Sequence, residues 1–514
     1  MVIKEKINVT VNIVRNILDE CCFPPELDSM LADIPAKIEE PLQLAIVGRI
    51  SSSKSTLVNA ILGKEEVVKT GAKEVTWNVN WLKYGDEAAI TAYYKDEKFR
   101  PEKIEKCRWQ DMANRSSDDK EQLKNDISYF EIKYPEADIL KKVNIIDTPG
   151  LSSHYGKDSQ NTMYFLEKMK PDAIVLVFSK GLNKNIVMDV KNLRQQIGAG
   201  FSPMNAIGVL ARIDDYWNND GKDPLEEGKK NIRNDVMSNE MVKNMLFNAY
   251  PVSAFTALAA CRITEADVKI MENIAKLPEN EIDDIFSSYI DFKEAFPEHA
   301  QHLLDICGRY GVWEIVKHLK KTGNSELTAI RELLRQKSGF KDFWEILNTH
   351  FTQEATTIKA INPIVSCMAK MREIAGTYPD DIREKWVMER AISEMDKLMI
   401  FLKLRSNVAE TKKQWYEGKL KIKQEDFEEL RRVNGEAGNS IRKRTGLNDH
   451  TTTQEVVDYC SKRIVHWRNQ LNTTGKMFPS SATFIKQILA LYAALKEFIV
   501  LSEPEYKTYK EFFN

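Results

Sequence analysis

Several features that mark particular protein classes are missing from this sequence. None of its seven cysteines belongs to a C-x-x-C pair or to a zinc-ligand spacing, so reduced thiols are expected rather than a disulfide framework or a zinc site. No window of about 18 residues is both apolar and uncharged, which argues against a membrane-spanning helix. The first residues also lack the basic and then apolar pattern of a signal peptide, and we therefore expect a cytoplasmic protein.

An excess of one charge is missing as well. The chain has 74 basic and 76 acidic residues, a net charge of −2, and this balance gives no support to a strongly basic nucleic-acid-binding protein. We find no internal repeat and no low-complexity tract. What remains is the composition of a soluble globular chain, and its 514 residues are enough for two or three domains.

The most informative stretch begins at Leu44. An apolar run over 44–47 predicts a short buried strand, a loop of small residues follows it, and the pattern from Leu57 predicts the start of a helix. Strand, loop and helix in this order are the parts of a phosphate-binding loop, in which backbone N–H groups and a helix N-terminus face an anion. The predicted nucleotide-binding residues of this loop are Gly48, Ser52, Ser53, Lys54, Ser55 and Thr56.

Two side chains of the loop have specific roles. Lys54 would bring a fixed positive charge to the phosphates, and the Ser55 hydroxyl would hold Mg²⁺. Ser53 departs from the usual G-x-x-x-x-G-K-[ST] pattern, in which a glycine at this position lets the backbone come close to phosphate. An ordinary strand–turn–helix with a chance Lys-Ser pair is the alternative interpretation.

A second short strand, predicted over 143–147, leads into the sequence Asp147-Thr-Pro-Gly150. Asp147 is placed to accept a hydrogen bond from a Mg²⁺-bound water. The Gly150 N–H can bond the terminal phosphate, so its loop can order or relax when that phosphate leaves. A plain turn is the alternative interpretation.

Another predicted strand, over 206–210, runs into Ala211-Arg-Ile-Asp214. An acid at the end of a strand in an open α/β sheet lies where ligands bind. A carboxylate accepts both N–H donors of guanine, and adenine presents no such pair. Asp214 is thus the candidate base reader, with a helix N-cap or an exposed acid as the alternative. Ser253, which follows a last short strand that begins at Ala249, could lie against the base.

The remaining patterns define the architecture. Residues 77–84 and 89–94 predict a β-hairpin, and 127–134 predict a further strand. From residue 255 to 319 the pattern is helical, and beyond about residue 325 we find no strand pattern. We therefore expect an α/β P-loop domain, with a mixed, mostly parallel sheet flanked by helices, and an all-α helical bundle. Apolar positions expected in the bundle core are Met395, Leu398, Met399, Leu402, Phe427 and Leu430.

The expected boundaries follow from these patterns. Residues 1–40 form N-terminal helices that pack on the C-terminal bundle, 41–324 form the α/β domain, and 325–514 form the helical domain, whose long helix breaks near 376–379. A loop at 434–448, rich in Gly and Asn, contains three consecutive basic residues. If it is a tip between two long helices, those charges can touch anionic lipid, at about 1 kcal/mol each. A solvated surface loop is the alternative that we favour.

The order of these motifs resembles the GTPase domain of the dynamin superfamily, in particular that of bacterial dynamin-like proteins. The likeness spans about residues 40–320, and the helical ends of the chain are similar to the neck and stalk of that family. The resemblance implies GTP and GDP as ligands, Mg²⁺ as cofactor, dimerisation through the GTPase head, and often membrane remodelling. A related dynamin-like chain as a partner, and a peripheral place at an anionic membrane, remain open.

The resemblance also implies roles for single residues. Ser51 would position the attacking water and Thr76 would hold Mg²⁺ and that water, so both join Lys54 as catalytic residues. The stem of Arg212 would cover the base, as a lysine does in the family's T/N-K-x-D pattern. The implied metal ligands are Ser55, Thr76 and, through a water, Asp147.

Some positions depart from the family pattern. Ile50 stands where dynamins often have a glutamine, Ser53 replaces a glycine, and Ala211 replaces a polar residue. The main hypothesis is a GTP-hydrolysing dynamin-like protein. The alternative is a degenerate GTP-binding scaffold with little or no hydrolysis that acts through partner proteins. A ribosome- or RNA-associated GTPase would need a compact basic module, and no such module stands out.

Overall fold

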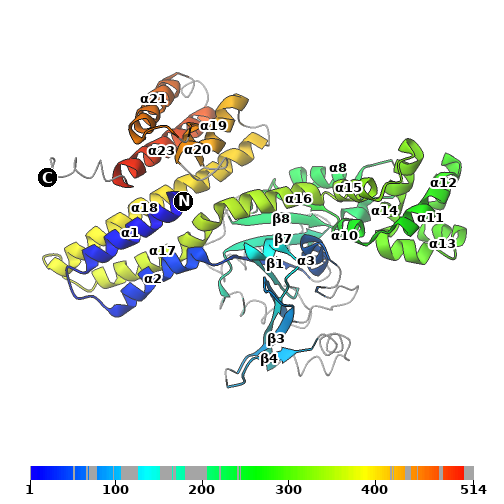
Figure 1. Cartoon of the computed structure of the whole chain (residues 1–514), viewed down its shortest axis with the longest axis horizontal. Coiled ribbons are helices and arrows are strands. Elements are labelled where there is room, and N and C mark those ends of the chain that lie inside the picture. The colour runs from blue at the N-terminus through cyan, green and yellow to red at the C-terminus, as the bar shows by residue number, and fades with distance from the viewer. Residues whose placement is uncertain are drawn as a thin grey trace. The chain divides into compact units, whose positions relative to one another are not determined.

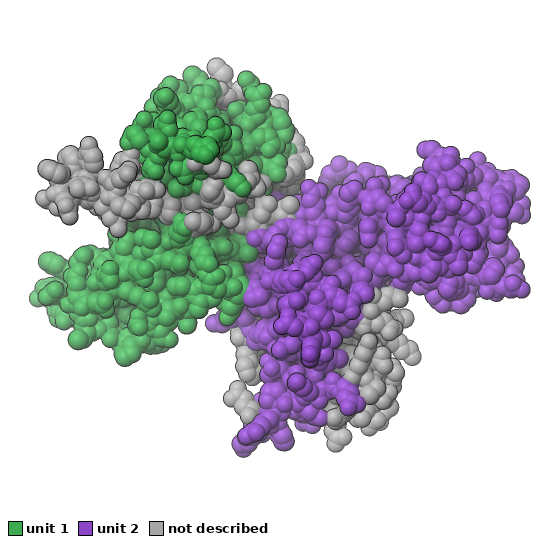
Figure 2. Space-filling model, in the orientation of Figure 1, with its two compact units in different colours: residues 1–40, 353–514 green, residues 41–352 purple. Residues whose placement is uncertain are grey.

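The structure is a computed structural model of the 514-residue chain. Its residues form two compact units, Pro41–Thr352 on the one hand and Met1–Glu40 with Gln353–Asn514 on the other (Figure 2). The residues that the structure describes are 2–49, 52–64, 67–68, 78–96, 98–105, 126–150, 165, 169–179, 205–218, 221–239, 242, 245–416, 420, 422–434, 441–448, 450–473 and 479–502.

The unit Pro41–Thr352 is built on a sheet whose described strands have the order β4-β3-β5-β2-β6-β1-β7-β8-β9 (Figure 1). The strands are β1 Leu42–Gly48, β2 Val79–Lys83, β3 Ala89–Tyr94, β4 Glu102–Ile104, β5 Ile127–Lys133, β6 Val143–Asp147, β7 Ala173–Ser179, β8 Ala206–Ala211 and β9 Ala249–Val252. Neighbours from β6 to β9 pair in parallel, whereas β2 is antiparallel to β6, and β3 is antiparallel to β4 and β5. This mixed, mostly parallel sheet with flanking helices confirms the predicted fold class.

The central strands have the sequence that their position requires. β1, β6 and β8 are buried along their whole length, and β7 is buried up to its last residue. Strands that are covered on both faces need near-continuous apolar runs, and this is why they could be recognised without an alternating pattern.

Helices and short turns of the unit are α3 Lys54–Leu62, η1 Asp138–Lys141, η2 Ile213–Tyr216, α8 Pro224–Asn231, η3 Ile232–Val236, α10 Ala254–Arg262, α11 Glu265–Ala275, α12 Glu279–Ile285, α13 Tyr289–Ala295, α14 Ala300–Thr322, α15 Leu327–Lys337, α16 Phe340–Ile346 and η4 Leu347–Phe351.

The predicted β-hairpin is wrong in its pairing. β5 lies between β2 and β3 in the described sheet, parallel to the first and antiparallel to the second. The connection from β2 to β3 passes the end of β5, where a Cβ on Gly85 would lie 2.8 Å from the Lys133 Cβ. The stacked rings of Tyr93 and Tyr129, 4.6 Å apart, join β3 to β5. Alternation could not reveal this arrangement, because a strand has the same period whichever neighbour it pairs with.

The second unit is helical in its described residues. Its helices are α1 Val2–Leu18, α2 Pro25–Glu39, α17 Thr352–Ala375, α18 Arg383–Tyr416, α19 Gln424–Asn434, α20 Ile441–Thr445, α21 Thr453–Asn472 and α23 Pro479–Ser502. The predicted break near 376–379 is confirmed, since α17 ends at Ala375 and α18 begins at Arg383. No described helix is long and apolar enough to cross a membrane.

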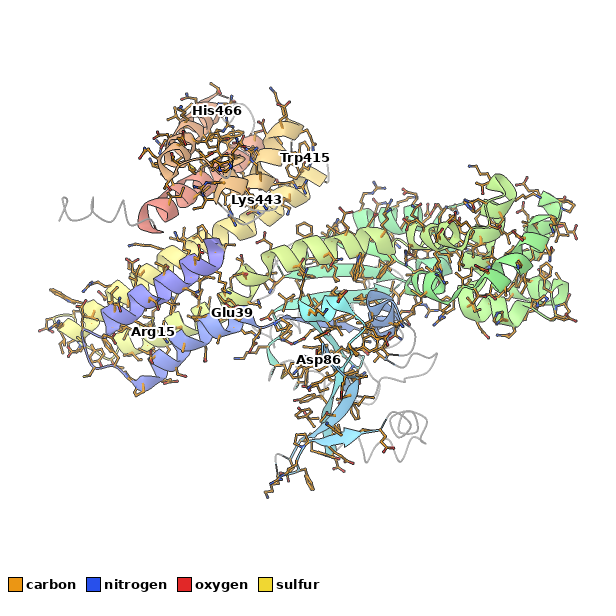
Figure 3. All side chains as sticks on the ribbon, in the orientation of Figure 1. Arg15, Glu39, Asp86, Trp415, Lys443 and His466 are labelled. Atoms are coloured by element: carbon orange, nitrogen blue, oxygen red, sulfur yellow. The ribbon has the colours of Figure 1, made fainter. Side chains whose placement is uncertain are left out.

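Two apolar cores hold this helical unit together. In the first, α1 and α2 pack on α17 and on the first part of α18, and α1 contributes one face at helical spacing, with Ile7, Val14 and Leu18 buried. In the second, α19, α21 and α23 pack together with the end of α18. All six expected core positions are buried. Arg15 of α1 also pairs with Asp28 of α2, at 3.1 Å from Nε to Oδ1 (Figure 3).

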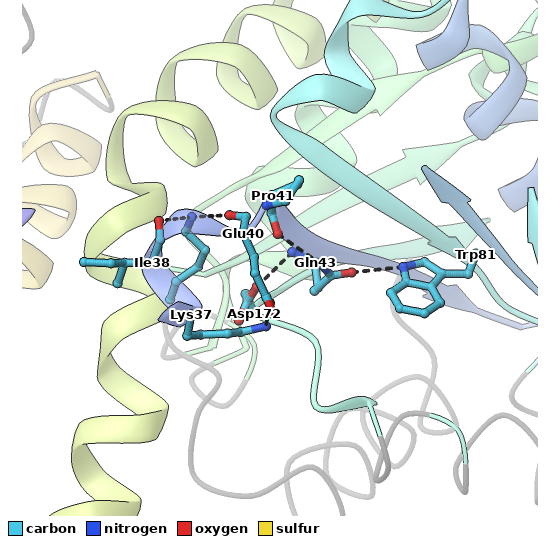
Figure 4. A network of polar contacts seen from close by, with 8 residues as sticks. Lys37, Ile38, Glu40, Pro41, Gln43, Trp81 and Asp172 are labelled. Atoms are coloured by element: carbon cyan, nitrogen blue, oxygen red, sulfur yellow. Dashed lines mark hydrogen bonds and ion pairs between the residues drawn. The ribbon is translucent and has the colours of Figure 1, made fainter. Parts of the chain in front are cut away.

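A buried lysine closes the C-terminal end of α2. Lys359 of α17, 6% exposed, donates to the carbonyl oxygen of Ile38 at 2.6 Å and also to that of Glu40. Figure 4 labels these two acceptor residues, Ile38 and Glu40. The last carbonyl groups of a helix have no partner within the helix and carry partial negative charge, so a cation is well placed there. The contact joins an N-terminal helix to a C-terminal one within the same unit.

The basic triplet at 442–444 is not an exposed flexible tip. Arg444 is 3% exposed and donates to the Val433 carbonyl, and Arg442 donates to the Thr451 carbonyl at 2.9 Å. Lys443, labelled in Figure 3, is the exposed member of the triplet. The helix α20, which the Gly- and Asn-rich composition did not suggest, turns these side chains toward α19 and the start of α21. Residues 435–440 of the expected tip lie outside the described residues.

The units divide after Thr352, so α15 and α16, expected in the helical domain, belong to the sheet unit. The reason is local packing. α15 packs on α10 and α14, and Phe340 of α16 packs against Ala60, Ala257 and Leu258. The six cysteines that the structure describes are free thiols, as their spacing predicted.

Candidate functional site

The strand ends bring the predicted residues to one edge of the sheet. β1, β6, β7, β8 and β9 run in the same direction, so their carboxyl ends share this edge. The register pairs Gly48 with Val177, and Ser179 with Ala211. The loop after Gly48 and the segment that holds Asp214 therefore start from the same edge, where ligands bind in open α/β sheets.

Gly48 and Ser53 fix the path of the phosphate-binding loop. A Cβ on Gly48 would lie 2.2 Å from the carbonyl oxygen of Val177, so the close approach of β1 and β7 requires glycine. Ser53 has φ +66° and ψ 27°, which is the left-handed conformation that a glycine takes at little cost. The loop thus keeps this backbone conformation with serine in place of glycine. α3 then begins at Lys54, and Thr56 lies in its first turn.

Lys54, Ser55 and Asp147 meet beneath this loop. Lys54 is 6% exposed, and its Nζ donates to the carbonyl oxygen of Arg49 at 2.9 Å. The Ser55 hydroxyl donates to Oδ2 of Asp147 at 2.9 Å, and the amide of Asn80 on β2 lies 3.5 Å from the same oxygen. Asn80 is a contact that sequence reasoning missed, because only the pairing of β2 with β6 brings it opposite Asp147.

Two polar atoms at this place are buried and lack a hydrogen-bond partner among the described residues. They are the Ser52 hydroxyl oxygen and Oδ1 of Asp147. Buried polar groups without partners are rare and costly, so such atoms indicate a ligand or ion. A serine hydroxyl beside one carboxylate is a donor set that suits Mg²⁺, which is usually held by one or two protein oxygens together with phosphates and water. The residues present therefore fit a Mg²⁺-bound phosphate.

The electrostatics of Asp147 suit a bound cation. Complete burial raises the pKa of its carboxyl group to about 6, while the charge of Lys54 and the hydrogen bonds from Ser55 and Asn80 act in the opposite direction. A divalent cation would stabilise the ionised form and reverse this shift. Gly150 lies three residues after Asp147 and is also buried. It is the last residue of the described range 126–150.

Three positions that the sequence analysis singled out lie outside the described residues. They are Ile50, Ser51 and Thr76. The proposed water-positioning groups and one implied metal ligand consequently stay predictions. The structure does bring together Lys54, the Ser55 hydroxyl and the Asp147 carboxyl group.

The second half of the site surrounds Asp214. It lies inside η2, whose N-cap is Arg212, so Asp214 is not itself a helix cap. Ser253 is the N-cap of α10: its hydroxyl accepts a hydrogen bond from the Thr256 N–H at 3.1 Å and donates to the Thr256 hydroxyl at 2.8 Å. The same hydroxyl lies close enough to the Asp214 carboxyl group to favour its ionised form. Burial raises the pKa of Asp214, and the Ser253 hydroxyl opposes that effect. Arg212 has φ +60°, and its Nε pairs with Asp215 at 3.0 Å.

A cavity of about 760 Å³ opens beside Asp214. Its size is within the range of small-molecule sites. One wall comes from the segment after β8, including Trp217, and another comes from the stretch 255–319, for which the sequence predicted only a helical pattern. The lining residues that sequence reasoning missed include Trp217, Phe255, Tyr289, Gly308, Arg309 and Tyr310. The only signal for any of them was a glycine at 308 inside a helical pattern.

Comparison with known proteins agrees with this geometry. The sequence model of the dynamin family matches residues 44–212. The isoniazid-induced protein IniC of Mycobacterium tuberculosis H37Rv is 23% identical over 463 residues, covering 85% of this chain and 86% of that protein. Dynamin-like protein 2 of Campylobacter jejuni is 26% identical over 144 residues, covering 28% of this chain and 22% of that protein.

A solved structure was also matched. It is of an oligomerised bacterial dynamin pair, described as a mechanism for long-range sensing and tethering of membranes, with 15% sequence identity and a TM-score of 0.32 over 99% of this chain and 78% of that one. The family match begins in β1 and includes Lys54, Asp147 and Arg212, the residues whose placement the strand ends explain. Over residues 44–212, which include Lys54 and Asp147 of this site, the chain is therefore similar to the dynamin family.

Proposed function

We propose that this chain binds GTP together with Mg²⁺ and hydrolyses it to GDP and phosphate. The observation that carries the proposal is the Ser55–Asp147 hydrogen bond beside two unpartnered buried oxygens, directly under a loop that ends in the buried Lys54. Asp214, with the Ser253 hydroxyl near its carboxyl group, would select guanine at the same edge of the sheet. The loop keeps its left-handed residue at position 53, which favours a working site over a degenerate one.

The chain's own residues would act mainly by position and charge. Lys54 would donate to the β/γ phosphate oxygens, exchanging its present bond with the Arg49 carbonyl for them. Ser55 would turn its oxygen toward the cation, and Asp147 would accept from a water of that cation. By resemblance, Ser51 and Thr76 would orient the attacking water. Mg²⁺, when bound, supplies charge neutralisation across the terminal phosphates.

We further propose that nucleotide state controls self-association through the nucleotide-binding face. Support comes from the similarity of residues 44–212 to the dynamin family and from a relative named as a dynamin-like protein. A cytoplasmic place with peripheral contact to an anionic membrane surface, and a second dynamin-like chain as partner, belong to the same proposal. The burial of Arg444 means that the triplet 442–444 does not offer three exposed charges for such contact.

A concentration series of GTP turnover tests the proposal. The rate per molecule should rise with protein concentration if dimerisation through the GTPase head completes the site. Lys54→Ala should abolish phosphate release, because it removes the phosphate-facing charge. Lys64→Ala is the matched control: this lysine lies just beyond the other end of α3, in a surface ion pair with Glu136, and its loss should leave turnover unchanged.

Two outcomes would count against the proposal. GTP binding in calorimetry without phosphate release over hours would support the alternative scaffold, which responds to nucleotide and acts through partner proteins. A rate that Lys54→Ala leaves intact would mean that the activity does not come from this pocket.

A further inference from the structure

We propose that Arg309 of α14 reads the O6/N7 edge of the guanine base, opposite the edge that Asp214 reads, and so shares in determining base specificity. The inference rests on the proposed nucleotide binding and adds a residue to it. No motif of the sequence includes Arg309, and the match to the family ends at residue 212.

The first step is that both residues face one cavity. Asp214, from the segment after β8, and Arg309, from α14, line the same space of about 760 Å³. A cavity of this size takes a whole ligand, and a base held by Asp214 would occupy it. Asp214 and Arg309 carry opposite charges, so the cavity offers an acceptor from one element and donors from another.

The second step is the backbone that places Arg309. α14 is not a continuous helix, because Gly308 has φ +67° and ψ 165° in its interior. A Cβ at this position would lie 3.2 Å from the ring of Phe255, which also lines the cavity. The glycine therefore permits both the bend and the close approach, and the residue immediately after the bend is Arg309.

The third step is how the guanidinium group is held. Its Cζ lies 4.9 Å from the ring centroid of Trp217 and 4.9 Å from that of Tyr289. One N–H group, on Nη1, donates to the carbonyl oxygen of Ser287 at 2.9 Å. The cation lies over both rings, and the Nη1 bond uses one of the five N–H donors that a guanidinium group carries in its plane. A ligand in the cavity would thus meet in-plane donors on a side chain that packing has already ordered.

The fourth step is the match to guanine. Guanine presents two neighbouring acceptors, O6 and N7, which suit the fork of an arginine. Adenine presents N7 next to an N–H donor, so an arginine there meets one acceptor and one repelling group. β8 does not supply a polar side chain in the position before Arg212, because Ala211 stands where the T/N-K-x-D pattern has one. Arg309 supplies donors that this alanine lacks.

Base analogues test the proposal on the full-length protein. GDP, 7-deaza-GDP, which lacks the N7 acceptor, and IDP, which lacks the 2-amino group, are titrated in the presence of Mg²⁺. We expect wild-type protein to bind 7-deaza-GDP about tenfold more weakly than GDP. The Arg309→Lys variant should bind GDP and 7-deaza-GDP about equally, because lysine keeps the charge but lacks the paired N–H donors of arginine. The preference for GDP over IDP, which depends on Asp214, should persist.

Arg331→Lys is the matched control. Arg331 is another helical arginine of the same unit that donates to a backbone carbonyl, that of Ile263 at 3.2 Å, and it is not among the residues that line the cavity. Its variant should keep both preferences.

Wild-type protein that binds 7-deaza-GDP as tightly as GDP would overturn the inference, whether or not the variants fold. An N7 preference that survives in a folded Arg309→Lys would overturn it as well. Either result leaves GDP binding itself in place. The absence of GDP binding by wild-type protein would instead overturn the proposed function together with the inference.

Discussion

The backbone N–H of Ser253 donates a hydrogen bond of 2.8 Å to the carbonyl oxygen of Ser338. Ser253 caps α10 and lies near the Asp214 carboxyl group, whereas Ser338 lies in the turn between α15 and α16 and is fully buried. The segment around Ser253, which we propose lies against the base, is therefore held by the turn at Ser338, far along the chain. Helices expected in a separate helical domain consequently form part of the support of the nucleotide site.

Gly339→Ala should damage this support. Gly339 has φ +69°, and a Cβ there would lie 2.2 Å from the carbonyl oxygen of Pro251 in β9. We expect a loss of roughly 3 kcal/mol in the free energy of unfolding, because backbone strain and a backbone clash act together. GDP affinity should fall too, since β9 leads directly into Ser253. Urea unfolding and a nucleotide titration measure the two effects.

Gly323→Ala separates the two causes. Gly323 has nearly the same φ, +68°, but a Cβ there would have no neighbour within 4 Å among the described residues. Only the conformational cost of about 1 kcal/mol should remain, and GDP affinity should be unchanged. Equal losses in the two variants would show that the contact with Pro251 does not matter.

The local sequence pattern was enough to predict the residues of the proposed phosphate-binding part of the site. Lys54, Ser55 and Asp147 lie at strand ends and helix starts, so their neighbours along the chain fix their position. Arg309 and Asn80 could not be found this way. Their place depends on a bend in α14 and on which strand pairs with β6, and strand pairing over long separations leaves little trace in periodicity. The same limit explains the wrong pairing of β2 with β3.

The predicted domain boundary and the predicted exposure of the basic triplet 442–444 were wrong for a related reason. The local pattern described α15 and α16 correctly as helical but predicted a loop where α20 lies, and burial against particular neighbours decided where all three belong. Phe340 packs on α3 and α10, and Arg444 is buried beside Val433. Neither contact has a signal in the local sequence.

Ser53→Gly should stabilise the protein. A serine in the left-handed conformation carries a steric cost that glycine avoids, and the Ser53 side chain makes no cap hydrogen bond in return. We expect a gain of about 1 kcal/mol in the free energy of unfolding. Ser288→Gly is the opposite case, because Ser288 caps α13 with ordinary φ −139° and accepts from the Asp291 N–H. That variant should lose a few tenths of a kcal/mol. A loss in both variants would argue against strain at position 53.

Lys359→Met should weaken the helical unit. The substitution keeps the length of the side chain but leaves the buried carbonyls of Ile38 and Glu40 without their charged donor. We expect a loss of about 2–3 kcal/mol in the free energy of unfolding. Lys370→Met is the matched control, since Lys370 also reaches from α17 to α2 but pairs with Glu26 at the surface, at 3.5 Å. Its loss should cost less than about 1 kcal/mol. Similar losses in the two variants would contradict a special role for the buried lysine.

The titration of Asp147 should determine how both the stability of the protein and its nucleotide affinity change with pH. Its pKa is raised from 3.8 to about 6 in the folded chain, so the folded state holds the proton at pH values where the unfolded state has released it. The free energy of unfolding of the ligand-free protein should therefore fall by roughly 2–3 kcal/mol as pH rises from about 4 to about 6, and then level off. Mg²⁺ with GDP needs the ionised carboxylate, so nucleotide affinity should change in the opposite direction and increase through the same range.

Asp147→Asn should flatten both profiles and stabilise the ligand-free protein at neutral pH. Unfolding curves and GDP titrations at several pH values measure this, and an Asn variant with the wild-type slope would locate the titrating group elsewhere.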